Sequence, residues 1–499
     1  MATAPLVPLV PGVSLGPFAL GASLRDVLTV IKNDSMQYPA IDLYYSQSEP
    51  VTTPVIVTAR ENGLRLRFDG ADQRLRLIEV MDFAKLRLAY KGSELVKGHG
   101  DNPAPARPVF KRVYSLFGPS YPGEYMPPKD GGLVGTYVLS WQGVALTFPI
   151  QDSAWSSEKD HVSMLGSHVA SPATHLAVFE GQSWADARRD LFVRQPAGPR
   201  QSGTVKKAVD TPAELELATV LGDGRVEFVR SQPDLPFTIV LNETIPQDLV
   251  TELGPPDAKH KRDDRSIVQE EMTRKSSMSR PICNGRTHPG SAPSSYSSTG
   301  TDTFDTEFDN RNLEEDTADR AARDEWWCYF SHGLDILVGL PIESTDSVGT
   351  KPLTPLSYSP HMTVLKVVIH GNVPGSYAFN RHRRLRWSIS LPSMPNISTP
   401  LINSEQQFDA DMKPHLLEVF ANGRLDSEMA RGKVVNRSWS GSGPSDSSFF
   451  LLRDDEQDLE EATAESGSEE WLANSKLYAF PGLVFEVLEN GAVSALTVY

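Results

Sequence analysis

Hydrophobic and polar positions alternate strictly in the stretch NGLRLRFDGADQRLRLIEV, residues 62–80. Leu64, Leu66 and Phe68 fall on one face of a period-2 strand, and the alternation resumes after the turn-forming residues DGAD. The opposite face carries arginines on both sides of the turn: Arg65, Arg67, Arg74 and Arg76. The pattern therefore predicts a half-buried antiparallel hairpin with a basic outer face.

The register of this hairpin brings like charges together. A loop over residues 70–73 places Arg67 opposite Arg76 and Asp69 opposite Arg74. Like charges that face each other across a ladder destabilise a sheet unless anions cover them. We therefore interpret the arginine face as a candidate docking surface for a partner or for anionic lipid. The alternative is that water or acidic residues of this chain neutralise it.

A helical pattern followed by strands occurs four times along the chain. Apolar residues at i, i+3, i+4 and i+7 predict the first helix after Ser23, which can serve as its N-cap. The other helices are predicted at 110–117, after an N-cap at Thr244, and within 413–423. Strand pairs with glycine-containing turns follow, for example at 142–143 and 481–482.

These four copies predict an α+β fold, built by duplication of helix-plus-antiparallel-hairpin units that form packed sheets. We expect two units in an N-terminal half (1–175), a connecting β-rich segment (176–243), and two units in a C-terminal half (244–499). The alternative is coincidence, since a helix that ends in glycine before a hairpin is common. Residues 259–323 and 426–474 are rich in serine, glycine and charge, and are predicted to be disordered loops.

Composition narrows the class of protein. A chain of 499 residues with 39% hydrophobic residues exceeds one ordinary core and predicts two or more domains. A formal net charge of −16 argues against non-specific nucleic-acid binding, which requires clustered cations. Two cysteines form no disulfide framework, which favours the cytosol or nucleus. Residues 1–24 contain several prolines and no basic residue, so we do not expect a signal peptide there.

The motifs of common catalytic sites are weak or missing in the sequence. GVSLG, residues 12–16, matches a nucleophile elbow, but Pro17 follows where that elbow requires a helix. The eleven histidines lack the spacing of metal-binding helices, and there is no P-loop. The carboxylates are concentrated in the predicted loops, where burial cannot raise a pKa. We therefore predict a protein that is not an enzyme, with no cofactor and no metal.

The densest basic segment is RHRRLRW, residues 381–387. Guanidinium groups bind phosphate and carboxylate in a bidentate manner, and a tryptophan can lie at the level of lipid headgroups. The candidate surface for an acidic partner or anionic lipid consists of Arg381, Arg383, Arg384, Arg386 and Trp387. The alternative is an edge strand whose charges prevent aggregation.

The stretch SDSSFFLLRDDEQD, residues 445–458, carries Phe449 and Leu452 at aromatic-x-x-aliphatic spacing, flanked by serines and acids. An extended segment of this kind can add a strand to a ubiquitin-like autophagy modifier and place both side chains in neighbouring pockets. We interpret Phe449 and Leu452 as a candidate modifier-binding motif. The alternative is that SFFLLR is an additional strand of this protein.

Several segments together resemble the phagosome assembly factor family: SLGPF, GLRLRFDGADQRLRLIEV, FGPSYPGEY, LSWQGVALTFPI, YFSHGLDILV, NVPGSYAFNRHRR and GLVFEVLENGAVSALTVY. The resemblance covers nearly the whole chain outside the two insertions, which are fungal in style. It implies a non-enzymatic cytoplasmic regulator of autophagy, recruited to the autophagosome formation site (the preautophagosomal structure). It also implies a complex with a WD40 β-propeller protein that binds phosphoinositides, and thus peripheral membrane association through that complex. The alternative function is a lipid or small-ligand carrier, because sheets covered by a helix can enclose an apolar cavity.

Overall fold

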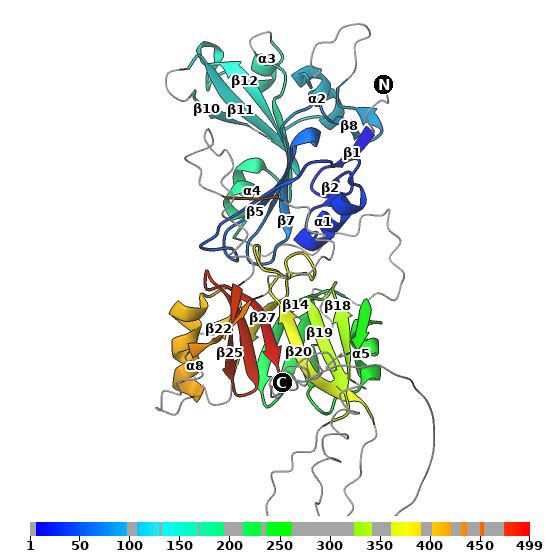
Figure 1. Ribbon diagram of the computed structural model, residues 1–499. Helices are drawn as coiled ribbons and strands as arrows, with labels where there is room; N and C mark the ends of the chain where they lie inside the picture. The colour runs from blue at the N-terminus through cyan, green and yellow to red at the C-terminus, as the bar shows by residue number, and fades with distance from the viewer. Residues whose placement is uncertain are drawn as a thin grey trace, which may run out of the picture.

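The structure, a computed structural model, describes residues 6–96, 107–121, 123–128, 132–167, 170–193, 213–230, 236–261, 324–341, 361–390, 402–420, 431–436, 450–453 and 474–499. Figure 1 shows these residues as two bodies placed end to end, the first blue to cyan and the second green to red. Buried apolar side chains form one large cluster between Val7 and Val178 and another between Leu215 and Val498. Each body therefore has its own core.

The first body contains a small sheet, a large sheet and four described α-helices. The small sheet has the order β3-β2-β1-β8-β9, with β1 (Leu6–Val10), β2 (Ser14–Leu15), β3 (Phe18–Ala19), β8 (Arg87–Tyr90) and β9 (Ser93–Glu94). The large sheet has the order β10-β11-β12-β13-β7-β6-β5-β4-β24, with β4 (Asp42–Tyr45), β5 (Val55–Ala59), β6 (Leu64–Phe68), β7 (Leu75–Val80), β10 (Glu124–Met126), β11 (Val134–Trp141), β12 (Val144–Gln151), β13 (His175–Phe179) and β24 (Phe450–Arg453). The helices are α1 (Leu24–Asn33), α2 (Phe110–Phe117), α3 (His161–Leu165) and α4 (Trp184–Asp190).

The second body has the same two kinds of sheet. Its small sheet has the order β16-β15-β14-β21-β22, with β14 (Leu215–Gly222), β15 (Arg225–Arg230), β16 (Phe237–Val240), β21 (Arg386–Ile389) and β22 (Ile402–Asn403). Its large sheet has the order β17-β18-β19-β20-β27-β26-β25-β23, with β17 (Ala258–Lys261), β18 (Glu325–Tyr329), β19 (Leu334–Gly339), β20 (Thr363–His370), β23 (Lys433–Asn436), β25 (Asn474–Phe480), β26 (Leu483–Leu488) and β27 (Val493–Val498). Its helices are α5 (Pro246–Leu253), the π-helical turn η4 (Phe408–Met412) and α8 (Lys413–Phe420).

The two bodies repeat one topology, so the predicted α+β fold with duplicated units is confirmed. In each body a three-stranded meander is followed by a helix and then by strands of the large sheet. A later strand returns parallel to the first strand of the meander, as β8 does beside β1 and β21 beside β14. In the middle of each large sheet lies a later strand, β13 between β7 and β12 in the first body and β27 between β20 and β26 in the second. The described strands after each helix are more numerous than the single hairpin that we expected.

Local sequence explains why the helices begin where they do. Ser23 caps α1 as predicted, since its Oγ accepts a hydrogen bond from the Asp26 amide at 3.1 Å. The prediction for Thr244 is wrong, because its Oγ1 accepts instead from the Val240 amide at 2.9 Å and stabilises the preceding turn. Ile245 occupies the N-cap position of α5, and its amide donates to Asp248 at 3.3 Å. The hydrogen bond from the Ile245 amide to Asp248 fixes the start of α5.

The β6–β7 hairpin contains a bulge that the alternation did not reveal. Arg67 lies opposite Leu77, and Phe68 lies opposite Leu75, so Arg76 is the additional residue. The predicted pairing of Arg67 with Arg76 is therefore wrong. Because a one-residue shift moves side chains to the other face, Leu75 faces the main core and Leu77 packs on the opposite face of the sheet.

Parts of the two predicted insertions form strands. Residues 259–261 belong to β17, and residues 433–436 and 450–453 form β23 and β24. Most of 259–323 and 426–474 lies outside the described residues. The segment 176–243 contributes to both bodies, because β13 belongs to the first large sheet and β14, β15 and β16 belong to the second body. Within the described part of the chain, no helix is sufficiently long and apolar to cross a membrane.

Candidate functional site

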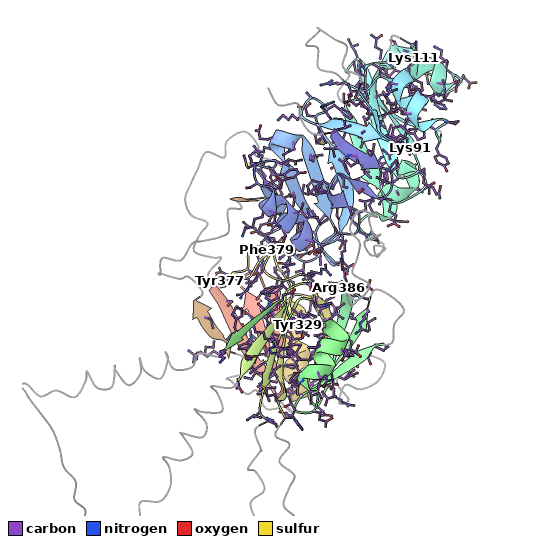
Figure 2. All side chains as sticks on the ribbon, turned by 90° about the vertical axis from the view of Figure 1, so that its right-hand side faces the viewer. Lys91, Lys111, Tyr329, Tyr377, Phe379 and Arg386 are labelled. Carbon is purple, nitrogen blue, oxygen red and sulfur yellow. The ribbon has the colours of Figure 1, made fainter. Side chains whose placement is uncertain are left out.

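The basic segment 381–387 lies at the junction of the two bodies, where Figure 2 places Arg386. Arg381 is exposed, but Arg383 and Arg384 are each only 5% exposed and Trp387 is 1% exposed. Trp387 packs in the second core, with its ring 6.0 Å from that of Phe485. The prediction of a basic surface with Trp387 at headgroup level is therefore wrong. The physical reason is the strand alternation of β21, which directs Trp387 into the core.

Arg383 joins the first body to the start of the second through two carboxylates. Its Nη2 donates to Asp26 Oδ2 of α1 at 2.6 Å, and its Nη1 lies 3.1 Å from Glu214 Oε2. Arg74 Nη1 reaches the same Glu214 oxygen at 2.8 Å. Burial raises the pKa of Asp26 and of Glu214, but Arg383, together with Ser23 at Asp26 and Arg74 at Glu214, outweighs that effect and holds both pKa values below their usual range.

Arg384 binds backbone carbonyl oxygens from both bodies. Its guanidinium donates to Ala71 O at 2.6 Å, Gly371 O at 2.7 Å and Ser404 O at 3.3 Å. Burial lowers the pKa of Arg384 to about 10, which still leaves it charged at neutral pH. Nearby, Arg386 lies 3.1 Å from Asp72. The two basic segments of the sequence therefore meet at one intramolecular interface.

The arginines of the β6–β7 hairpin also find partners within this chain. Arg76 Nε lies 3.1 Å from Asp69 Oδ2, and Arg67 lies over the Phe192 ring at 5.1 Å. Arg65 lies opposite Glu79 in the ladder. Together with the Arg74 ion pair, these contacts show that the hairpin is not a bare docking face. The structure agrees instead with the alternative, in which groups of this chain cover the arginines.

The candidate modifier motif is only partly described. Phe449 lies outside the described residues, whereas Leu452 lies in β24. β24 pairs in parallel with β4, with Leu452 beside Tyr44. This pairing agrees with the alternative for Leu452, in which the segment forms an additional strand of this protein. Binding of a modifier at Phe449 and Leu452 stays a prediction.

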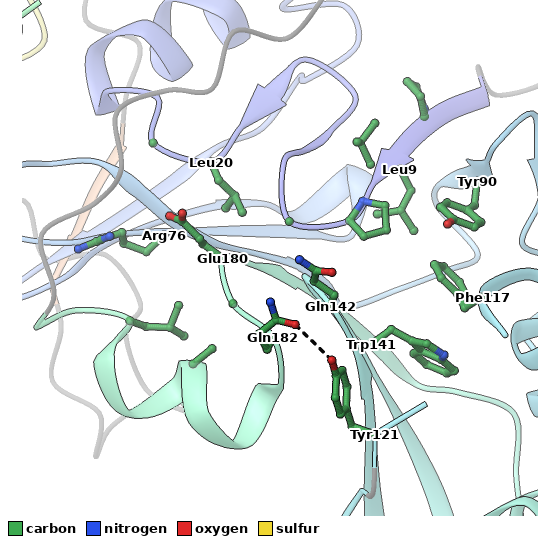
Figure 3. Close-up of a pocket in the computed structure, with 18 of the residues that line it drawn as sticks. Leu9, Leu20, Arg76, Tyr90, Phe117, Tyr121, Trp141, Gln142, Glu180 and Gln182 are labelled. Atoms are coloured by element: carbon green, nitrogen blue, oxygen red, sulfur yellow. Dashed lines mark hydrogen bonds between the residues drawn. The ribbon is translucent and has the colours of Figure 1, made fainter. Parts of the chain in front are cut away.

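The first body contains a groove of about 1900 Å³, which we call the β1–α4 groove (Figure 3). One wall is apolar and comes from the small sheet and the end of α2. Tyr90 and Phe117 stack there with ring centroids 4.4 Å apart, and Phe117 lies 5.3 Å from Trp141. The other side is polar, and Tyr121 Oη donates to Gln182 Oε1 at 3.2 Å. The arrangement offers aromatic surface together with hydrogen-bonding groups.

A contact between two turns shapes this groove. The Gly12 amide donates to Gly143 O at 2.9 Å, which brings the turn after β1 against the turn between β11 and β12. Gly143 has φ 76°, and a Cβ there would lie 2.2 Å from the Gly12 nitrogen. Only glycine fits both the backbone conformation and the close approach. Ser14 of the GVSLG segment is buried in β2 and does not lie on a strand-to-helix turn.

A cluster of two histidines and an aspartate in the second body escaped the sequence analysis. His370 and His382 Nε2 lie 2.9 and 2.8 Å from the two carboxylate oxygens of Asp335. No motif spacing indicated it, because β19, β20 and a loop each contribute one residue. The two rings stack 3.7 Å apart at 9°, and the Nε2 atom of each contacts a different oxygen of Asp335. That geometry suits hydrogen bonding to Asp335 better than tetrahedral metal coordination.

The charge state of this cluster follows from its burial. Burial raises the pKa of Asp335, but hydrogen bonds from His370 and His382 outweigh it and hold that pKa well below its usual range. Burial lowers the pKa of His382 to about 4. The cluster therefore holds an ionised carboxylate against the Nε2 atoms of two stacked histidine rings at neutral pH.

Comparison with known proteins identifies the family. A profile of phagosome assembly factor 1 matches residues 14–281 and 310–499. The chain belongs to the phagosome assembly factor 1 family. It is 27% identical to a PHAF1 protein of Arabidopsis thaliana over 52% of this chain and 58% of that protein. It is 21% identical to a PHAF1 protein of Drosophila melanogaster over 98% of this chain and 93% of that protein.

A third member of the phagosome assembly factor 1 family, from Caenorhabditis elegans, is 29% identical over 26% of this chain and 29% of its own length. The aligned part thus spans less than two thirds of the Arabidopsis relative and nearly all of the Drosophila relative. No solved structure matches the chain significantly.

Proposed function

We propose that this protein is a non-enzymatic cytoplasmic adaptor in the formation of phagosomes or autophagosomes, and that it binds a polypeptide partner in the β1–α4 groove. The observation that supports this proposal is the size and lining of that groove. Its volume of about 1900 Å³ exceeds the roughly 300–1,000 Å³ of typical small-molecule pockets. Aromatic side chains beside polar groups are characteristic of protein interfaces.

The partner that we propose is a WD40 β-propeller protein, which the family resemblance implies. Four carboxylates line the groove, those of Glu180, Asp186, Asp190 and Glu216, against two cations, Arg76 and Lys91. Such a rim favours a partner segment with basic residues and disfavours direct contact with anionic headgroups. We therefore propose that the protein reaches the autophagosome formation site through its partner, which binds the phosphoinositides.

A paired substitution tests the groove. Tyr121 is 44% exposed, and its contact with Gln182 crosses the polar side of the groove. Tyr121→Ala combined with Gln182→Arg should abolish co-purification of the propeller protein from the source cell. Trp155→Ala, at a 38% exposed aromatic residue outside the groove, is the matched control and should leave co-purification unchanged. Retention of the propeller by the groove variant would reject the proposal.

The apolar wall of the same groove favours one second candidate, a carrier of a lipid or another small apolar ligand. Leu9 and Phe117 line this wall, Leu20 lies farther along the groove near Arg76 and Glu180 (Figure 3), and the volume of the groove can hold an acyl chain. Native mass spectrometry of the purified protein separates the two candidates. A retained lipid that is lost in a Leu20→Asp variant supports the carrier, whereas the bare protein mass supports the adaptor.

A further inference from the structure

The duplicated fold allows the same sheet face to be compared in the two bodies. In the first body, α4 and the residues after it cover the outer face of the large sheet. Trp184 lies with its ring 5.2 Å from Phe179, and its amide donates to Ser140 Oγ at 3.2 Å. Trp184, Ala187, Leu191 and Phe192 pack with Leu77, Val138, Ala145 and Phe179 into a separate apolar cluster. In the chain, α4 comes directly after β13, the central strand of the large sheet.

In the second body the equivalent face has a different character. The described helices α5, η4 and α8 contribute their apolar side chains to the main core rather than to this face. On the outer face, Trp326, Val368, Leu477 and Val484 line a hollow of about 510 Å³ across β18, β20, β25 and β26. All four are half-buried side chains, and we call this region the outer-sheet hollow. It corresponds in topology to the place that α4 occupies in the first body.

The two cations of the outer-sheet hollow contact aromatic rings, Lys366 that of Tyr499 and Arg381 that of Phe330, each at 5.8 Å. Lys366 and Arg381 line the hollow, and within the described residues neither makes an ion pair. Of the acids in the hollow, Asp335 is bound by His370 and His382. Glu486 accepts a hydrogen bond from Ser475 at 2.8 Å. An apolar floor with cations at its edge fits an acidic amphipathic segment.

We propose that the outer-sheet hollow binds a short acidic amphipathic helix of a separate protein, in the place that α4 takes on the first body. The first body supplies the expected pattern of that helix. Trp184, Ala187 and Leu191 stand at i, i+3 and i+7, which is one face of a helix. The partner helix carries an aromatic anchor, a small residue and an aliphatic residue at this spacing, with acids toward Lys366 and Arg381. Tyr377, which is 60% exposed, lies at the rim of the hollow (Figure 2).

A designed peptide tests this proposal without knowledge of the natural partner. The probe is a fluorescent peptide with the sequence of residues 180–193 and the changes Arg188→Glu and Arg189→Glu. Fluorescence anisotropy with the full-length protein should show saturable binding that weakens as salt is added. The same peptide with Trp184→Ala and Leu191→Ala should bind at least about tenfold more weakly, because it lacks both anchors.

Variants of the protein locate the peptide. Lys366→Glu with Arg381→Glu should weaken binding at least about tenfold by charge reversal, with an unchanged circular dichroism spectrum. Lys111→Glu, at an exposed lysine of the first body (Figure 2), is the matched control and should bind as the wild type does. No binding, or equal binding by the double variant, overturns the proposal. In a further variant, a Gly-Ser linker replaces the acidic residues 454–473. If the peptide binds only to this variant, the hollow is occupied by this chain itself, and the proposal is also overturned.

This inference is independent of the proposed function, because the two sites share no lining residue. Loss of propeller binding in the Tyr121 and Gln182 variant tests the β1–α4 groove. Peptide binding to Lys366 and Arg381 variants tests the outer-sheet hollow. Each can fail while the other holds.

Discussion

Arg383 donates a hydrogen bond of 2.6 Å to Asp26, although 357 positions separate the two residues in the chain. The bond joins α1 of the first body to the segment that precedes β21 of the second. Arg383 is 5% exposed, so neither water nor salt can readily replace Asp26 and Glu214 as its partners. This ion cluster makes the two bodies depend on each other for stability.

Removal of Arg383 should therefore destabilise the whole protein. Arg383→Met removes the buried cation that the half-exposed Asp26 and Glu214 carboxylates share, although Glu214 keeps its contact with Arg74, and should lower the free energy of unfolding by about 1–3 kcal/mol. Chemical denaturation measures this change. Arg381→Gln is the matched control, because the exposed Arg381 side chain should contribute within about 0.5 kcal/mol. Equal stability of the two variants would contradict this account of the interface.

Arg384 should not tolerate lysine. Lysine keeps the charge but cannot reach the carbonyl oxygens of Ala71, Gly371 and Ser404 with one planar group. The unpaired carbonyls should cost at least about 2 kcal/mol in the Arg384→Lys variant.

Arg386→Lys provides the comparison for Arg384. Arg386 is 30% exposed and binds carboxylates, which lysine can also pair, so this change should cost less than about 1 kcal/mol. Thermal unfolding of both variants measures the difference. A larger loss at Arg386 than at Arg384 would show that the carbonyl contacts contribute little.

Two glycines with similar backbone angles should respond differently to alanine. Gly143 has φ 76° and Gly92 has φ 75°, so both substitutions introduce comparable backbone strain. A Cβ at Gly143 would meet the Gly12 backbone at 2.2 Å, whereas nothing lies within 4 Å of one at Gly92. Gly143→Ala should therefore lower the free energy of unfolding by at least about 2 kcal/mol more than Gly92→Ala, as overpacking against fixed backbone does.

Gly143→Ala should also weaken propeller binding, since Gly143 and Gly12 hold together the turns at the β1–α4 groove. Denaturation with urea measures the stability of both alanine variants, and co-purification measures binding. Equal losses of stability would mean that the two turns can separate without cost.

Stability should fall as the pH decreases from about 6.5 to about 4. Burial lowers the pKa of His332 to about 4, and the charge of Arg383 adds to this effect. Between these values the unfolded chain binds a proton on His332 that the folded protein does not, so acid favours unfolding. This loss of stability is complete below the pKa of His332 in the folded protein. It can reach about 3 kcal/mol, because each unit of pKa difference between the folded and unfolded states corresponds to 1.36 kcal/mol.

His332→Asn should reduce this pH dependence, measured as urea unfolding at pH 7 and pH 4.5. His361→Asn, at an exposed histidine, is the matched control and should retain the wild-type dependence. A His332 variant with the full loss of stability in acid would assign the effect to other groups.

Features that depend on near neighbours in the chain were predictable. The spacing of Leu24, Val27, Leu28 and Ile31 predicts α1, and all four are buried. The turn at 142–143 and the duplicated α+β fold also followed from local pattern, because they depend on period and on glycine. The role of the arginines at the interface of the two bodies could not be predicted from local pattern. Their partners lie far away in sequence, and no local pattern shows that a positive charge will meet Asp26 or Glu214.

Two smaller features explain two further errors. One additional residue, Arg76, shifts the β6–β7 register and moves Leu77 to the other face. In RHRRLRW the number of arginines suggested a surface, although Leu385 and Trp387 alternate with the charged positions and both are buried. Alternation was the more informative signal in that segment. Charge density alone did not distinguish a docking surface from an internal interface.

The central position of β27 in its sheet has a consequence for biosynthesis. β27 pairs with β20 on one side and with β26 on the other, and the ribosome makes it after both of them. Until β27 emerges, β20 and β26 each present an unpaired edge of apolar sequence, which is a template for aggregation. The first body can pair β13 with β7 and β12 while the second body is still being made, whereas the second large sheet has to wait for β27. We therefore expect the nascent second half to be more prone to aggregation than the first.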